Sequence, residues 1–263
     1  MEQLYFHIGL PKTGSTFLQS IIKNDKRIND QRSSIHKFRP DVQSFKFVKG
    51  KSNVVSNETF LLKGEGAGKY NMMKTLSEIK ALSADIKIII TLREPYSLLL
   101  SMFKYRIKNG AYFKSFDDWF FKDEAQDLFS ILHYNVLYQS IQTFFSKNNI
   151  FFLFYEDLKN ENFMIKEFYE ILNLNPKTFP EKALNKSLSS NELIKLNYLN
   201  KLLHSKRLKR RLFRYVPLLT TDANFFKSDY AYQIKHHIQK DMELFYNEVS
   251  GTTQTKLKKH NYL

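Results

Sequence analysis

The sequence contains no cysteine and no long apolar run, and each absence excludes a class of protein. Without cysteine, the 263-residue chain can form neither a disulfide framework nor a thiolate metal site. The longest apolar runs, at 86–92 and 150–155, are far shorter than the roughly 20 residues that cross a bilayer. The first residues also lack a basic segment followed by an apolar one. We therefore expect no signal peptide and a cytoplasmic protein.

Acidic residues are few relative to basic ones. Against 41 lysines and arginines there are 26 aspartates and glutamates, which gives a formal net charge of +15. Such a balance favours nucleic acid, an acidic membrane surface or an acidic substrate as partner. The plainer interpretation is solvated surface, and we prefer it except where the charge is clustered. With 43% hydrophobic residues, the chain is apolar and long enough for one sizeable core.

Short apolar runs alternate with helical patterns along the first two thirds of the chain. Such alternation predicts βαβ units and a parallel sheet covered on both sides. We expect an α/β fold, a three-layer α/β/α sandwich with a mainly parallel central sheet and a helical C-terminal region. We also expect a single domain at 1–263, with an α/β core at 1–190 and a helical extension at 190–263. The predicted strands are 4–9, 53–58, 86–92 and 150–155, and the helices between them include 15–23, 70–83, 95–108 and 133–149.

The segment "HIGLPKTGST" nearly matches the P-loop pattern G-x-x-x-x-G-K-[ST]. Gly9 and Gly14 have the required spacing, and Thr16 occupies the Ser/Thr position. Ser15, however, replaces the lysine, and the lysine of this loop is Lys12. Between a strand and a helix, such a loop directs backbone N–H groups and the positive end of a helix dipole at an anion. We therefore expect the three-layer sandwich to be of the P-loop type. No aspartate for Mg²⁺ ends the strand "IKIIITL", which weakens a kinase hypothesis without excluding it.

A second candidate element begins where that strand ends. Arg93 follows it directly, at the edge where open α/β sheets bind ligands, and Ser101 lies eight residues further along a predicted helix. A guanidinium and a hydroxyl near a helix start are suited to a second phosphate. Glu156 and Asp157 follow a later strand, but an acidic pair at a helix start is more often a cap than a metal ligand.

The two elements together resemble the sulfotransferases that use 3′-phosphoadenosine-5′-phosphosulfate (PAPS). "GLPKTGSTFLQ" resembles their 5′-phosphosulfate loop, and "REPYSLLLS" resembles their 3′-phosphate element, an Arg and a Ser eight apart. "IFFLFYEDL" is similar to the strand and acidic turn that follow, and "NKSLS" is similar to a segment of the bacterial and carbohydrate-acting branches. The resemblance covers about residues 4–190. The Arg-Lys-Gly segment of the cytosolic small-molecule branch is missing from the sequence, which favours the carbohydrate-type branch.

The resemblance implies in-line transfer of a sulfuryl group to an acceptor hydroxyl, with 3′,5′-bisphosphoadenosine (PAP) as product and no metal required. Lys12 would lie against the oxygen that bridges phosphate and sulfur and would stabilise the charge that develops there. The 3′-phosphate would be held by Arg93 and Ser101, with Ser187 in place of the missing segment. The 5′-phosphate would be bound by Lys12, Thr13, Gly14, Ser15 and Thr16.

A general base must also accept the proton of the acceptor hydroxyl. Members of the family use a histidine or a glutamate after the second strand, and Glu58 best matches that position here. A helix-capping role is an equally good interpretation of Glu58. His36 is the alternative base, whereas His7, just before the glycine loop, is more typical of a packed strand histidine.

The leading hypothesis is a PAPS-dependent sulfotransferase that acts on a carbohydrate or glycolipid hydroxyl. The alternatives are a small-molecule P-loop kinase and a non-enzymatic polyanion-binding protein. The basic run 204–219 is suited to an acidic glycan, to peripheral contact with an anionic membrane or to nucleic acid. A solvated helix face is the default interpretation of this run, and we expect no specific nucleic acid partner. Trp119 is suited to stacking on a sugar, but core packing is favoured.

Overall fold

The computed structural model describes residues 3–30, 46–57, 72–82, 85–159, 161–177, 188–215, 217 and 225–263. The chain forms two compact units. The first comprises Met1–Glu94, Ile131–Lys182 and Asp241–Leu263, and the second comprises Pro95–Ser130 and Ala183–Lys240. The predicted single domain, with an α/β core at 1–190 and a helical extension at 190–263, stays a prediction.

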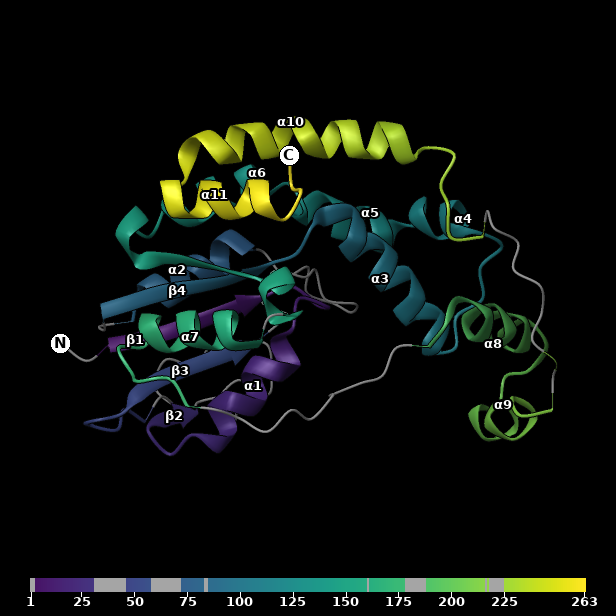
Figure 1. The fold of residues 1–263 in the computed structure, drawn as a ribbon, viewed down its shortest axis with the longest axis horizontal. Helices are drawn as coiled ribbons and strands as arrows, with labels where there is room; N and C mark the ends of the chain where they lie inside the picture. The colour runs from purple at the N-terminus through teal and green to yellow at the C-terminus, as the bar shows by residue number, and fades with distance from the viewer. Residues whose placement is uncertain are drawn as a thin grey trace. The chain divides into compact units, whose positions relative to one another are not determined.

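A five-stranded parallel sheet forms the centre of the first unit (Figure 1). Its strands, in the spatial order β2-β3-β1-β4-β5, are β1 (Gln3–Gly9), β2 (Ile28–Asp30), β3 (Ser52–Asn57), β4 (Asp85–Leu92) and β5 (Ile150–Phe154). Phe6 in the central strand lies opposite Val55 of β3 and Ile88 of β4. Because all five strands are parallel, the segments that follow β1, β4 and β5 meet at one edge of the sheet, where such folds bind ligands.

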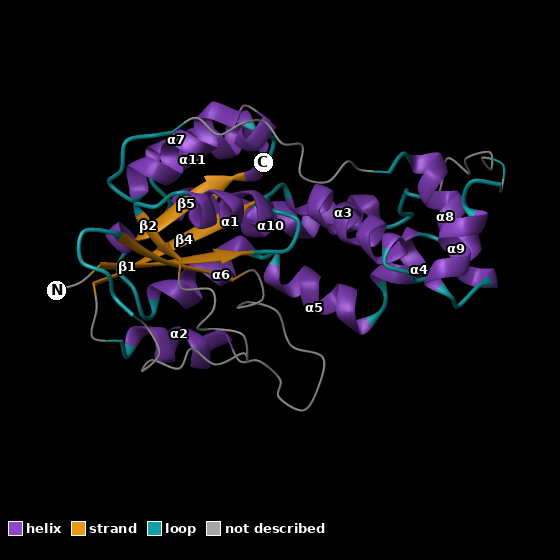
Figure 2. Ribbon diagram, turned by 90° about the horizontal axis from the view of Figure 1, so that it is seen from below, coloured by secondary structure: helices purple, strands orange, loops and turns teal. Residues whose placement is uncertain are grey.

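Helices cover both faces of this sheet. Figure 2 shows α2 and α7 on opposite sides of it. On the face of α1 and α7, Leu18 and Phe168 pack with Tyr5 in one buried cluster. On the other face, Phe152 lies 5.5 Å from the ring of Tyr138 in α6 and 5.3 Å from Phe245 in α10. The helices that contribute to this unit are α1 (Ser15–Asn24), α2 (Met72–Lys80), α6 (Tyr134–Gln142), α7 (Glu161–Ile171), the second part of α10 (Ala231–Glu248) and α11 (Gly251–Lys259), with the 3-10 turns η3 (Lys147–Asn149) and η4 (Tyr155–Lys159).

The predicted α/β fold, a P-loop-type three-layer sandwich with a parallel central sheet, is therefore confirmed. One strand was missed, and one helix prediction is wrong. The short strand β2 was not predicted, and the helix predicted at 133–149 is the shorter α6 followed by the separate turn η3. The helix predicted at 95–108 is confirmed: proline suits its first turn, and Gly110 follows its end with a left-handed φ of +108°.

The second unit contains helices and connecting turns, and no strand, among its described residues. Its helices are α3 (Pro95–Lys108), α4 (Phe116–Phe120), most of α5 (Asp123–Ile131), α8 (Ser190–Leu202), α9 (Lys206–Leu212) and the first part of α10. Its core is aromatic, with the ring of Phe103 within 6 Å of Phe113, Phe116, Trp119 and Phe225. Trp119 is only 1% exposed, so its ring packs in this core and is not available to a sugar. None of the helices in the described part of the chain is long and apolar enough to cross a bilayer.

Candidate functional site

The loop between β1 and α1 turns through a left-handed backbone. Lys12 has a φ of +67°, and Gly14, the N-cap residue of α1, has a φ of +87°. The first turn of α1 contains no acidic residue. Its N–H groups, which have no partner within the helix, and the positive end of the helix dipole are therefore not offset by a carboxylate of the helix itself. This end of α1 fits an anion.

The three hydroxyls of the predicted 5′-phosphate loop differ in their surroundings. Thr13 is fully buried, and its Oγ1 donates to the carbonyl of Leu10 at 2.6 Å. Ser15 is 2% exposed, and its Oγ reaches the same carbonyl at a long 3.4 Å. Thr16 is exposed. Thr13 thus braces the loop, whereas the long bond leaves Ser15 weakly held and Thr16 faces solvent.

Arg93 and Lys12, which were predicted from separate motifs, lie together. Arg93 Nη1 donates to the carbonyl of Lys12 at 2.9 Å, and the guanidinium carbon is 4.2 Å from the ring centroid of Tyr155. Since a carbonyl and an aromatic ring are uncharged, these two contacts orient the guanidinium without neutralising it. The arrangement presents positive charge beside the glycine loop, which suits a ligand with more than one phosphate.

The backbone at Arg93 and Glu94 is fixed by two buried phenols and a carboxylate. Tyr134 Oη donates to the carbonyl of Arg93 at 2.6 Å, and Glu156 Oε1 accepts from the N–H of Glu94 at 2.9 Å. The hydroxyl of Tyr262 donates to the other carboxylate oxygen of Glu156, also at 2.9 Å. Burial raises the pKa of both phenols, so they remain neutral donors. Glu156 therefore connects the end of β4 to the carboxyl-terminal segment.

The turn η4 lies directly against the glycine loop. A Cβ placed on Gly14 would be 3.3 Å from Leu158 Cδ1 and 3.5 Å from Tyr155 Cδ2. The same Tyr155 ring supports Arg93. One turn after β5 thus contacts both predicted phosphate elements.

Helix α11 and the residues after it anchor this turn through a buried carboxylate. Asp157 is 1% exposed and lies 3.1 Å from Lys256 Nζ, 3.4 Å from Lys259 Nζ and 2.9 Å from His260 Nε2. Burial acts to raise the pKa of Asp157, but Lys256 and the neighbouring cations hold it below its usual range. The ionised carboxylate thus ties η4 to the end of the chain.

His7 is buried in the centre of the sheet and does not serve as a base there. Its Nδ1 lies 2.8 Å from Ser56 Oγ in β3, and its Nε2 lies 2.6 Å from Thr91 Oγ1 in β4. Burial lowers the pKa of His7 to about 4, so the ring is neutral near pH 7. Two hydroxyls satisfy a neutral ring in either tautomer. His7 is the packed strand histidine that the sequence predicts.

Four other predicted residues belong either to the second unit or to the part of the chain that the structure does not describe. Ser101 belongs to the second unit, on α3, where it is half-buried. Glu58, His36 and Ser187 lie outside the described residues. Their roles stay predictions. Conversely, Tyr155 was not predicted from the sequence; its only local signal is that it follows β5 as Arg93 follows β4.

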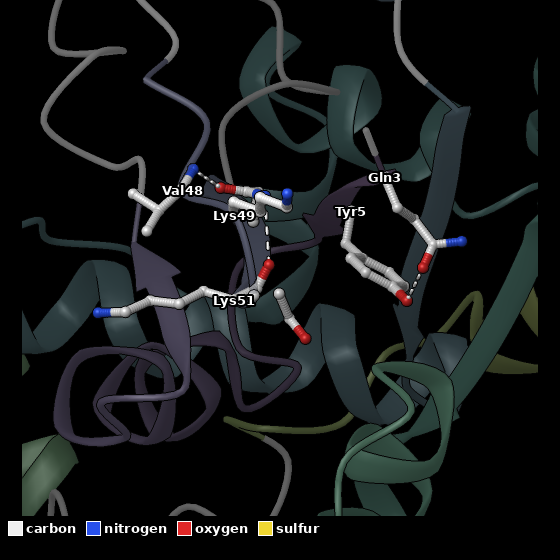
Figure 3. Close-up of a pocket in the computed structure, with 8 residues that line it drawn as sticks. Gln3, Tyr5, Val48, Lys49 and Lys51 are labelled. Carbon is white, nitrogen blue, oxygen red and sulfur yellow. Dashed lines mark hydrogen bonds between the residues drawn. The ribbon is translucent and has the colours of Figure 1, made fainter. Parts of the chain in front are cut away.

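A small pocket lies at the opposite edge of the sheet, at the start of β1 and β3 (Figure 3). Its volume is about 190 Å³, and its lining includes Lys49 and Lys51. Tyr5 donates to Gln3 Oε1 at 2.6 Å, and Asn53 accepts from the N–H of Val48 at 3.0 Å. Because parallel sheets bind ligands at the carboxyl ends of their strands, this pocket is separate from the site above.

Comparison with known proteins identifies the family. A family model described as "Sulfotransferase domain" matches residues 5–250. No curated protein matches the chain. Among solved structures, a sulfotransferase from Alicyclobacillus acidocaldarius is 14% identical, with a TM-score of 0.52 over 79% of this chain and 98% of its own.

Two further solved structures are more distant in shape. The sulfotransferase domain from the curacin biosynthetic pathway is 13% identical, with a TM-score of 0.47 over 67% of this chain and 76% of its own. Mouse sulfotransferase SULT7A1 in complex with PAP is 14% identical, with a TM-score of 0.46 over 98% of this chain and 89% of its own. The bacterial enzyme shows the shared fold, and the family model spans most of the chain. The chain therefore belongs to the sulfotransferase family, the PAPS-dependent enzymes that its glycine loop and Arg-Glu-Pro segment resemble.

Proposed function

We propose that this enzyme transfers the sulfuryl group of PAPS to a hydroxyl of a carbohydrate, in an oligosaccharide, a polysaccharide or a glycolipid. The observation that carries the donor assignment is the 2.9 Å hydrogen bond between Arg93 and the carbonyl of Lys12, which joins the two predicted phosphate elements. The carbohydrate acceptor is supported by the resemblance of "NKSLS" to the carbohydrate-acting branches. The lack of cysteine supports a cytoplasmic location.

The residues present fit a donor with two phosphate-bearing ends. The left-handed loop and the acid-free first turn of α1 offer N–H groups to one phosphate. Arg93 offers a planar guanidinium to a second, from a position fixed by Tyr134 and Tyr155. Each element alone is compatible with many anions, and the pair together favours a bisphosphate nucleotide.

Each residue then has a defined part in the reaction. When bound, PAPS supplies the sulfuryl group and the bisphosphate leaving group. Lys12 and the loop N–H groups stabilise the charge that develops on the oxygen bridging phosphate and sulfur. Arg93 and Ser101, with Ser187, hold the 3′-phosphate, and Thr13, Ser15 and Thr16 with Gly14 surround the 5′-phosphate. Glu58 accepts the proton of the acceptor hydroxyl, with His36 as the alternative.

Calorimetric titration with PAP tests the donor assignment. PAP, 5′-AMP and ATP–Mg²⁺ are titrated into the wild type, Arg93→Ala and the control Lys23→Ala, which removes an exposed cation at the far end of α1. Loss of charge-assisted hydrogen bonds to a phosphate should weaken PAP about 10- to 100-fold in Arg93→Ala. Binding of 5′-AMP, which has no 3′-phosphate, should be unchanged, and the control should behave as the wild type.

The opposite pattern contradicts the proposal. Binding of ATP–Mg²⁺ without binding of PAP would favour the kinase. Equal weakening of PAP and 5′-AMP in Arg93→Ala would show that Arg93 does not hold the 3′-phosphate. In a transfer assay with PAPS and a panel of glycans, Lys12→Ala should lower kcat by about 10²–10³. If only non-carbohydrate hydroxyls accept sulfate, the acceptor class is wrong.

A further inference from the structure

The second unit contains a segment with an unusual concentration of positive charge. Residues 193–221 include eight lysines and arginines and no aspartate or glutamate, so they supply more than half of the net charge of +15. The described centre of this segment is the end of α8, the short helix α9 and the turn after it (Figure 1). We call the exposed side chains of 202–215 the α9 surface. The proposed sulfuryl transfer does not use it.

The cations of the α9 surface are not neutralised within the described structure. Arg207, Arg210, Arg211 and Arg214 are all exposed. None of them takes part in a salt bridge with another described residue. The carboxylates in those salt bridges pair with other basic residues. Four guanidinium groups within eight residues therefore face solvent without a bound carboxylate, which creates a strong local positive potential.

The same surface also exposes large apolar side chains. Leu202 is 56% exposed, Leu208 43% and Tyr215 79%. The neighbouring lysine points the other way: Lys209 is only 8% exposed. A helix that served only as a solvated face would place the leucine inward and the lysine outward. Here the exposed side chains of α9 combine arginines with Leu208, and Tyr215 is exposed in the turn after it, which resembles the composition of helices that lie on membranes.

We propose that the α9 surface docks on an anionic membrane, with its arginines at the lipid phosphates and with Leu208 and Tyr215 at the boundary between headgroups and acyl chains. An acidic polysaccharide would use the arginines equally well, but it offers no apolar phase for the exposed leucine and tyrosine. The apolar side chains therefore favour a lipid surface. Each arginine near such a surface is expected to contribute about a fivefold factor in affinity, which is reduced by salt. The proposal does not depend on the identity of the sulfuryl donor.

Vesicle co-sedimentation tests the proposal with three matched variants of the full chain. Vesicles contain phosphatidylcholine alone or with one third phosphatidylserine. Arg207→Gln/Arg210→Gln/Arg211→Gln removes three charges from the surface, and Leu208→Ser/Tyr215→Ser removes its apolar groups. The control Lys23→Gln/Lys26→Gln/Lys108→Gln removes three exposed charges elsewhere. A soluble sulfated polysaccharide is titrated into the same four proteins.

The wild type should bind only the anionic vesicles, and the arginine variant should bind them about 100-fold more weakly. The Leu208/Tyr215 variant should lose vesicle binding severalfold and keep polysaccharide binding, while the control should stay near the wild type. Equal losses in the arginine variant and the control would mean that only net charge matters, and the proposal would be overturned. Binding of the polysaccharide through the arginines without binding of vesicles would equally overturn it and identify a glycan as the partner.

Discussion

The two glycines of the loop serve different physical needs, and substitution should separate them. Gly9 lies in β1 without a positive φ, but a Cβ there would be 2.3 Å from Ser15 Oγ, well inside contact distance. Gly14 has a φ of +87°. A Cβ there would lie 3.3 Å from Leu158 Cδ1, which is closer than usual but involves the end of a side chain. Gly9 therefore provides space, whereas Gly14 provides a left-handed backbone.

The magnitudes follow from these contacts. Gly9→Ala should lower the free energy of unfolding by about 1–3 kcal/mol, the usual range for overpacking. Ser15→Ala alone should cost at most about 1 kcal/mol, because its hydrogen bond to Leu10 is 3.4 Å long. When both changes are combined, the nearest atom to the new Cβ is His7 Cε1 at 3.2 Å. The double variant should therefore be about 1 kcal/mol more stable than Gly9→Ala.

Gly14→Ala should behave otherwise. A left-handed φ costs an alanine about 1–2 kcal/mol, and removal of the Ser15 hydroxyl does nothing to relieve it. Urea unfolding of the single and double variants, analysed as two double-mutant cycles, measures both couplings. We expect a coupling of at least 1 kcal/mol for Gly9 with Ser15, above the ~0.5 kcal/mol error of additivity, and none for Gly14 with Ser15. Additive effects of Gly9→Ala and Ser15→Ala would refute the steric argument.

The same variants report on the ligand. If the Ser15 hydroxyl binds the 5′-phosphate, the double variant Gly9→Ala/Ser15→Ala recovers stability without recovering PAP affinity. Its affinity should equal that of Ser15→Ala. Full recovery of PAP binding in the double variant would show that Ser15 only packs beneath the loop.

Three further predictions concern buried groups. Burial lowers the pKa of His7 from 6.5 to about 4, so between these pH values the unfolded chain binds more protons than the folded one. The free energy of unfolding should therefore fall by about 3 kcal/mol as the pH drops from 6.5 to 4. Urea unfolding should show this loss in the wild type and not in His7→Gln. Tyr262→Phe removes a hydrogen-bond donor from Glu156 and should weaken the binding of PAP severalfold but not that of 5′-AMP, whereas the control Leu263→Ala should change neither. Equal weakening of the binding of both ligands would indicate a general structural effect. Asp157→Asn removes the buried carboxylate that Lys256, Lys259 and His260 share. Because Lys256 keeps Glu167 as a partner, the variant should lose about 2 kcal/mol of stability, whereas Glu170→Gln, which affects an exposed pair, should change little; similar effects of the two would contradict the assigned anchor.

The strands could be predicted because the sequence marks them locally. The runs at 4–9 and 86–92 are largely apolar; the first ends at Gly9, and Arg93 follows the second. β1 and β4 match these runs within one residue. β2 has only three residues and one buried apolar side chain. Its position depends on pairing with β3 and on the turn before it, where Asp25 accepts from Arg27 and Tyr169. Such contacts leave no periodic pattern in the sequence.

The same distinction explains what could be predicted of the site. The glycine loop and Arg93 each belong to a short motif with a physical meaning, so their residue types and spacing were sufficient. Tyr134, Glu156 and Tyr262 act through single hydrogen bonds to residues far away in the sequence. Glu156 contacts Glu94 across 62 positions and Tyr262 across 106. No local pattern encodes such a contact, and only the fold brings its partners together.

These remote contacts also determine which groups the carboxylate of Glu156 meets at this edge of the sheet. Glu156 accepts from the N–H of Glu94 and from the hydroxyl of Tyr262, so both of its oxygens are directed at uncharged donors. Burial keeps the phenol of Tyr262 protonated, so it stays a donor. Arg93 is meanwhile oriented by a carbonyl and a ring, contacts that hold a guanidinium without cancelling its charge. Neutral groups thus position the guanidinium of Arg93 at this edge of the sheet, beside the glycine loop that carries Lys12.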